Sequence, residues 1–108
     1  MPSYRGRDKE FDISYGIASV ALNTTGLTVV ATTAAFYHGL SILASAAVVI
    51  VKVYNSAGGT SNLVDVIYAS ATGTGWTDKY IPIVCRTGLC VSVTGTGGDG
   101  VIYYSPRG

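Results

Sequence analysis

The sequence predicts an all-β domain, an antiparallel β-sandwich of about eight short strands with a jelly-roll-like or Ig-like arrangement. Short runs rich in β-branched and aromatic residues occur along the chain, several with apolar and polar residues in alternation. Gly-containing clusters separate these runs, and the chain has 14 glycines but only three prolines. No stretch keeps the apolar period of a long helix. At 108 residues the chain suits one domain, with a modest core that needs no metal or disulfide.

The strand expected at the centre of the fold is residues 46–54. Alternation places Lys52 on the face that also carries Val48, Ile50 and Tyr54, and the opposite face is wholly apolar. A strand with apolar side chains on both faces must be covered on both. One face therefore belongs to the core, and either the second sheet or a neighbouring subunit covers the other.

The N-terminal part of the domain is expected to contribute three strands, residues 17–22, 26–31 and 36–44. A short helix over residues 15–22 is the alternative for the first of them, but Gly16 and the missing caps argue against it. In the third strand, Leu40 and Ile42 share a face.

After the turn at residues 55–59, four more strands are expected, at 62–68, 76–84, 89–94 and 101–104. Pro82 restricts its strand to a sheet edge or a bulge because it cannot donate to the ladder. Residues 86–88 and the Gly-rich residues 95–100 are expected to be hairpin loops. The last strand then closes the sheet.

Charge is scarce and unevenly distributed. Only 12% of the residues are charged, about half the usual share, and the formal net charge is +1. No global attraction to nucleic acid or to acidic lipid is expected from this balance. Between Ile13 and Val64 the only ionic residue is Lys52. The deficit indicates a surface that copies of the chain or a partner cover.

Residues 1–12 are expected to form an extended N-terminal arm that precedes the β-sandwich domain of residues 13–108. Most charges of the chain's first part crowd into this arm, without apolar periodicity. One interpretation is a frayed terminus. The other is an arm that orders on a neighbouring subunit, with its anchors at Tyr4, Arg5, Arg7 and Phe11.

Targeting and membrane signals are absent from the sequence pattern. The N-terminus is polar and lacks the apolar core of a secretory signal. Residues 34–51 are uncharged, but His38, Gly39 and two serines interrupt them, and they break like two strands rather than one spanning helix. No membrane partner is expected.

No catalytic or metal-binding constellation emerges. Cys85 and Cys90 bracket a short loop and are expected to be either a disulfide across a hairpin or two buried thiols. With two thiols and His38 as the single histidine, the chain lacks the four ligands of a structural zinc site. No sequence motif places a nucleophile beside His38. No enzyme activity and no cofactor are therefore expected.

The aromatic residues are more informative than the titratable ones. Tyr and Trp are enriched at interfaces, where an apolar body is buried and a polar tip stays wet. Expected contacts with partners or with other copies in the folded domain are Lys52, Tyr54, Trp76 and Tyr80. The alternative is a carbohydrate-binding or adhesin module that uses exposed Trp76, Tyr80 and Tyr103.

Three patterns suggest a family. They are Phe36-x-x-Gly39-Leu40 with Val49-x-Val51-x-Val53-Tyr54-Asn55, then Tyr80-x-Pro82-Ile83 with Gly88-Leu89-x-Val91-Ser92-Val93-Thr94-Gly95-Thr96-Gly97, and the ending Val101-x-Tyr103-Tyr104. In these patterns the chain resembles small structural proteins of tailed-phage virions. The resemblance implies a β-sandwich, often trimeric, that decorates or cements a capsid or forms part of a neck or fibre. It brings no catalytic residues.

These observations lead to one functional expectation. The protein is expected to be a non-enzymatic capsid decoration or cement subunit that self-associates, most simply as a homotrimer, and binds the major capsid protein or another virion protein. Its place would be the virion, assembled in the host cytoplasm. A neck, tail or fibre component and the carbohydrate-binding module are the alternatives.

Overall fold

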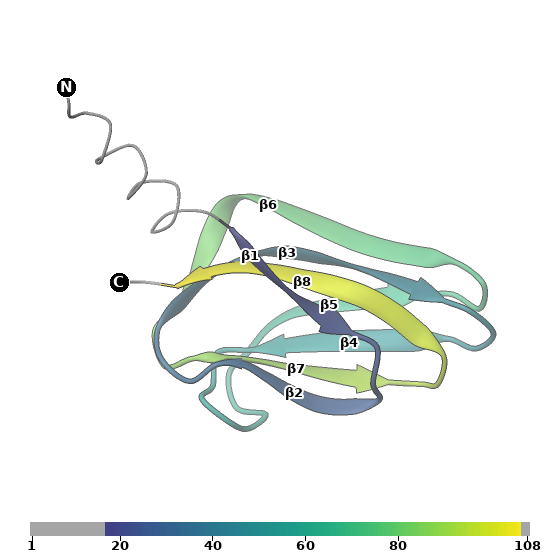
Figure 1. Cartoon of the computed structure of the whole chain (residues 1–108), viewed down its shortest axis with the longest axis horizontal. Helices are drawn as coiled ribbons and strands as arrows, with labels where there is room; N and C mark the ends of the chain where they lie inside the picture. Colours follow the sequence, from purple (N-terminus) through teal and green to yellow (C-terminus); the bar gives the residue numbers. More distant parts are fainter. Residues whose placement is uncertain (1–16, 107–108) are drawn as a thin grey trace.

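The protein is a sandwich of two four-stranded antiparallel sheets (Figure 1). The computed structural model describes residues 17–106. Its strands are β1 (Ala18–Leu22), β2 (Gly26–Ala31), β3 (Ala35–Ala44), β4 (Val49–Tyr54), β5 (Leu63–Ala69), β6 (Thr74–Cys85), β7 (Leu89–Thr94) and β8 (Gly98–Pro106). The predicted all-β fold is confirmed, and these residues include no helix long and apolar enough to cross a membrane.

The strand order is that of a jelly roll. The first sheet runs β1-β8-β3-β6 and the second sheet runs β2-β7-β4-β5. The antiparallel pairs β1 with β8, β2 with β7, β3 with β6 and β4 with β5 describe one long hairpin rolled into two layers. Of the two arrangements that the sequence left open, the structure has the jelly-roll one.

Two connections differ from the expected hairpins. The loop at residues 86–88 leads from β6 in the first sheet to β7 in the second, and residues 95–97 lead back to β8 in the first. The hairpin predictions for both loops were wrong, because a Gly-rich turn reverses the chain equally well within a sheet or between sheets. β8 lies inside the first sheet, between β1 and β3.

The strand predicted at the centre is central in the second sheet. β4 lies between β7 and β5, and Val49, Val51 and Val53 are fully buried against the first sheet. Lys52 points to the outer face of the sheet. The strand begins at Val49 instead of residue 46, because the preceding residues cross from β3 to β4 and are exposed.

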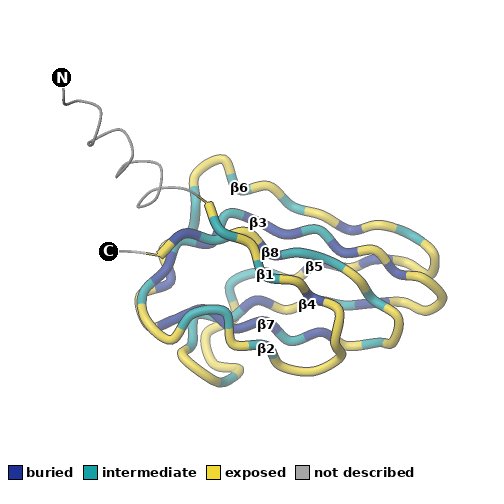
Figure 2. The backbone as a smooth tube through the Cα atoms, in the orientation of Figure 1, coloured by how far each residue is buried: buried dark blue, intermediate teal, exposed yellow. Residues whose placement is uncertain are grey.

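The core fills the space between the sheets, and Figure 2 shows buried segments along the strands and exposed ones at the loops. A polar cluster ties the sheets together at one side of this core. The Tyr37 hydroxyl donates to Asp65 Oδ2 at 2.9 Å, and Lys79 Nζ lies 3.4 Å from the same oxygen. Asp65 Oδ1 accepts the Val66 N–H at 3.0 Å. Both carboxylate oxygens are therefore satisfied, by residues of β3, β5 and β6.

β6 is an edge strand with a large irregularity, as Pro82 predicted. Opposite β3, its register jumps from Ile83, which faces Tyr37, to Asp78, which faces Gly39. The intervening residues bulge outward, so that Tyr80 is 96% exposed. This irregularity also shapes the outer face of the first sheet.

Candidate functional site

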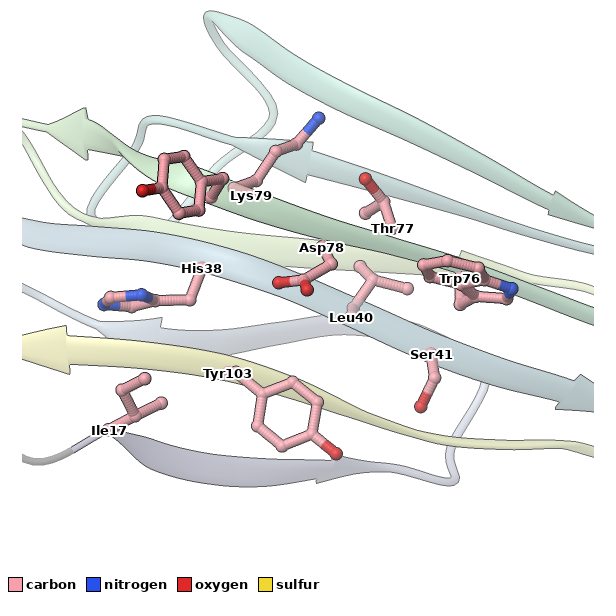
Figure 3. A pocket seen from close by; sticks show the side chains of 10 residues that line it. Ile17, His38, Leu40, Ser41, Trp76, Thr77, Asp78, Lys79 and Tyr103 are labelled. Atoms are coloured by element: carbon pink, nitrogen blue, oxygen red, sulfur yellow. The ribbon is translucent and has the colours of Figure 1, made fainter.

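An aromatic groove lies on the outer face of the first sheet (Figure 3). Its volume is about 640 Å³, within the range of about 300–1,000 Å³ that is usual for small-ligand pockets. It is lined by Ile17, His38, Leu40, Ser41, Trp76, Thr77, Asp78, Lys79, Tyr80 and Tyr103. All of these lie on or beside the strands of one sheet, so the groove is a feature of a rigid surface.

The strand register explains which side chains flank the groove. Gly39 of β3 pairs with Asp78 of β6 on one side and with Tyr103 of β8 on the other. Two residues along β3, Ser41 pairs with Trp76 in the same way. Neighbouring strands are about 4.8 Å apart, so the Asp78 and Tyr103 backbones stand about 10 Å apart. Gly39 has no side chain to fill the space between them.

The polar groups of the groove lie among the rings. In Figure 3, Asp78 of β6 lies across β3 from Tyr103 of β8, His38 lies toward one end of the groove, and Ser41 lies near Trp76 at the other end. Within residues 17–106, Asp78 forms no ion pair. Its carboxylate is exposed and available to accept hydrogen bonds.

The surroundings of His38 favour its neutral form. Burial lowers its pKa below the ordinary value, and the nearby Asp78 charge opposes this shift but is the smaller effect. Nε2 lies 2.9 Å from Ser105 Oγ. A neutral imidazole has one donor and one acceptor nitrogen, and which of them carries the proton depends on its hydrogen-bond partners.

The His38–Ser105 pair has the residue types of a nucleophile and its base, but its surroundings do not suit acyl transfer. Ser105 is only 8% exposed. Pro106 follows it and has no N–H to stabilise an oxyanion. Among residues 17–106, no carboxylate is hydrogen-bonded to His38. We assign the pair to packing at the end of β8.

The outer face of the second sheet is apolar around one lysine. We call this surface the Lys52 face. It consists of Lys52 and the apolar residues Leu27, Val29, Ile50, Val66 and Tyr68, with Ser92 and Thr94 of β7 between β2 and β4. The side chain of Lys52 is exposed, and its cross-strand partners are Val66 and Ser92. Among the outward positions of these four strands, Lys52 is the one charged residue.

The predicted contact residues therefore fall on two opposite surfaces. Lys52 and Tyr54 lie on the outer side of β4, whereas Trp76 and Tyr80 lie on β6 of the other sheet. The three rings proposed for carbohydrate binding, Trp76, Tyr80 and Tyr103, line one groove. The predicted anchors Tyr4, Arg5, Arg7 and Phe11, and with them the arm at residues 1–12, lie outside the described residues.

Of the ten groove residues, only Trp76, Tyr80 and Tyr103 were predicted as site residues. The groove residues that were not predicted include the polar residues His38, Ser41 and Asp78. The alternation of β6 places Asp78 on the same side as Trp76, which is a signal in the sequence. His38 and Ser41 reach the groove because β3 pairs with both β6 and β8. This pairing leaves no local signal in the sequence.

The two cysteines do not share a hairpin. Cys85 ends β6 and packs in the core, whereas Cys90 belongs to β7 and its thiol donates to the Ser56 carbonyl at 3.1 Å. Both thiols are free and buried, and burial raises the pKa of each. The described part of the chain holds no cluster of His, Cys, Asp and Glu suited to a metal ion.

Comparison of the chain with protein-family models, with curated proteins and with solved structures gave no match.

Proposed function

We propose that the protein is a non-enzymatic structural subunit of a tailed-phage virion, which decorates or cements the capsid and associates with copies of itself. The observation that carries this proposal is the Lys52 face. The resemblance of residues 36–104 to virion proteins supports the choice of particle. Jelly rolls serve as capsid and as lectin domains alike, so the fold by itself does not select the role.

An antiparallel sheet that faces water normally alternates apolar-in and polar-out. On the Lys52 face, Leu27, Val29, Val66 and Tyr68 point outward and are each about half exposed. Covering them contributes about 25 cal/mol per Å² of apolar area, before the costs of association. An apolar outer face on a chain with little charge suits a subunit that works in an assembly.

The position of Lys52 restricts the symmetry of such an assembly. A twofold contact centred on this face brings two ammonium groups together, which is destabilising. A cyclic contact, in which the face meets a different surface of the next copy, avoids this repulsion. We therefore propose a homotrimer, or a contact with the coat protein, in which the partner places a carboxylate or a carbonyl oxygen against Lys52.

The arm supplies the second part of the attachment in this proposal. Residues 1–12, with Tyr4, Arg5, Arg7 and Phe11, contact the major capsid protein. A variant that lacks residues 1–12 keeps the folding transition of the full chain and is lost from purified particles. If the variant stays on the particles, the arm has no part in attachment.

Light scattering over a series of protein concentrations tests self-association. Val66→Asp places a buried charge in the contact and is expected to shift the protein to the monomer, without lowering its melting temperature by more than a few degrees. The matched control is Leu43→Asp, an exposed apolar position on the other sheet. An oligomer that survives Leu43→Asp and is lost in Val66→Asp assigns the contact to the Lys52 face, whereas loss in both variants places the second surface of the contact near Leu43. A native chain that remains monomeric at high concentration contradicts the proposal.

The virion assignment is tested on purified particles by mass spectrometry, and absence of the protein there overturns it. The same particles distinguish the capsid from the alternative places. Antibody-gold labelling is expected over the head, whereas labelling at the neck, tail or fibres assigns the subunit to that structure instead.

A further inference from the structure

We propose that the aromatic groove binds neutral pyranose units of a glycan. This role is separate from assembly through the Lys52 face, because the two surfaces lie on opposite sheets of the sandwich.

The rings provide the apolar part of such a site. Trp76 is 69% exposed and Tyr103 is 41% exposed, on two strands that flank β3. One side of a pyranose ring presents mainly C–H groups, and these pack on the negative face of an aromatic ring. The outward bulge of β6 adds Tyr80, so apolar surface is available at more than one point of the groove.

Polar groups stand between the rings, where sugar hydroxyls would lie. The Asp78 carboxylate accepts charge-assisted hydrogen bonds from sugar hydroxyl groups. Ser41 both donates and accepts. His38 Nε2 is paired with Ser105, so Nδ1 remains to donate or accept one hydrogen bond according to the tautomer. A set that mixes acceptors and donors matches a neutral polyol.

The charge of the groove argues against other occupants. Among residues 17–106, Lys79 is the one cation that lines the groove, and Asp65 of the polar cluster engages it. This part of the chain therefore offers an anion no free cation in the groove, and Asp78 repels the anion. An apolar protein surface laid over the groove buries the Asp78 carboxylate without a partner, which is costly. A ligand that brings hydroxyl groups to Asp78 avoids both penalties.

Tryptophan fluorescence gives a direct test, because Trp76 is the only tryptophan in the chain. Glycan-array screening selects ligands, and the full-length chain is then titrated with free cellotriose, maltotriose, chitotriose, mannotriose and the array hits. We expect a saturable change in Trp76 emission with at least one neutral sugar and none with the sulfated or sialylated counterparts.

Matched variants locate the binding. Asp78→Ala and Tyr103→Ala are each expected to weaken binding about tenfold or more, from the loss of a charge-assisted hydrogen bond or of a stacking surface. Tyr68→Ala, an exposed ring of the second sheet, is the control and is expected to leave the titration unchanged. Circular dichroism spectra and melting curves of all three confirm that they fold.

The outcomes separate the candidate occupants. Absence of any saturable response to neutral sugars overturns the proposal, as does binding that survives both groove variants. Trp76 emission that changes with protein concentration alone identifies a second copy as the occupant and also overturns it. Particle incorporation is measured independently, so a groove that binds no sugar leaves the structural role standing.

Discussion

At the scale of single residues, the polar cluster of Tyr37, Asp65 and Lys79 is the most consequential feature. Tyr37 is fully buried, and its hydroxyl reaches across from the first sheet to the second. Burial is the main reason that its pKa rises above the ordinary tyrosine value, and the hydrogen bond to Asp65 adds to the effect. The cluster links β3 and β6 of the first sheet to β5 of the second.

Tyr37→Phe is expected to lower the free energy of unfolding by about 1 kcal/mol, because the part-buried Asp65 carboxylate loses a hydrogen-bond donor. Urea denaturation followed by far-UV circular dichroism measures the change. The control is Tyr68→Phe, which alters an exposed ring and is expected to stay within about 0.5 kcal/mol of the native chain. Equal midpoints for Tyr37→Phe and the native chain contradict the assigned role.

His38 is expected to make stability depend on pH on the acid side. Its pKa in the folded protein is lower than the unfolded value of 6.5. The unfolded chain therefore binds more protons between these two values, and stability falls as the pH drops through 6.5 toward the folded pKa. Above that window the effect of His38 on stability is fully favourable.

The comparison of the native chain with His38→Gln isolates this effect, because glutamine does not titrate. Urea midpoints of the two proteins are measured between pH 8 and pH 5. We expect the native chain to lose more stability than the variant over this range. Two curves that fall in parallel show that another group is responsible.

At the scale of elements, the irregular pairing of β3 with β6 decides the shape of the groove. It depends on Gly39, which has a φ of +130°, a region that residues with a side chain rarely adopt. A Cβ at this position also meets the Thr77 carbonyl oxygen and the Asp78 backbone. Backbone conformation and close approach both require glycine here.

Gly39→Ala is expected to destabilise the protein by about 2 kcal/mol or more, since strain and a steric clash act together. Gly26→Ala is the informative comparison, because Gly26 also has a positive φ but no heavy atom near the added Cβ. Thermal melts should rank the native chain above Gly26→Ala and Gly26→Ala above Gly39→Ala. The reverse order for the two variants contradicts the clash.

The strands could be predicted from the sequence because the patterns that indicate them are local. Alternation within residues 46–54 identified the buried face of β4, and Pro82 identified an irregular edge at β6. The connections after β6 and β7 could not be predicted, because a turn sequence does not indicate which sheet the next strand joins. Pairing in a jelly roll is mostly between strands distant in the chain.

The same distinction applies to the candidate site. Exposed rings at Trp76, Tyr80 and Tyr103 were proposed from residue type, and the fold places them in one groove. His38 stood apart from any catalytic motif in the sequence, and Asp78 was not singled out. They come together because β3 is paired on both sides and its register shifts near His38, a tertiary feature with no local pattern.

At the scale of the whole molecule, the two sheets divide two roles in our proposals. The Lys52 face serves assembly, and the aromatic groove on the opposite sheet serves glycan binding. This division makes the roles separable by mutation, since Val66 and Asp78 lie on different layers. A variant altered at both positions is expected to lose both properties and keep its fold.

The rolled hairpin also gives the sandwich two distinct ends. Ala18 pairs with Tyr104, so the described chain enters and leaves at the same end, and the loops that follow β1, β3, β5 and β7 gather at the other (Figure 1). Hydrogen bonds from Thr25 and Ser45 to carbonyls of the loop after β7 hold part of that end together. Ala71 and Thr72, in the loop after β5, are exposed.

Because the two ends of the sandwich differ, a peptide inserted at one end projects in a defined direction. An epitope peptide inserted between Ala71 and Thr72 is expected to change the melting temperature by only a few degrees, because exposed loop tips tolerate insertion. If the protein decorates particles as we propose, the inserted peptide should be reached by its antibody, since it projects from the end opposite to Ala18 and Tyr104. If the antibody reaches the inserted peptide on the free protein but not on particles, the subunit is attached in the opposite orientation.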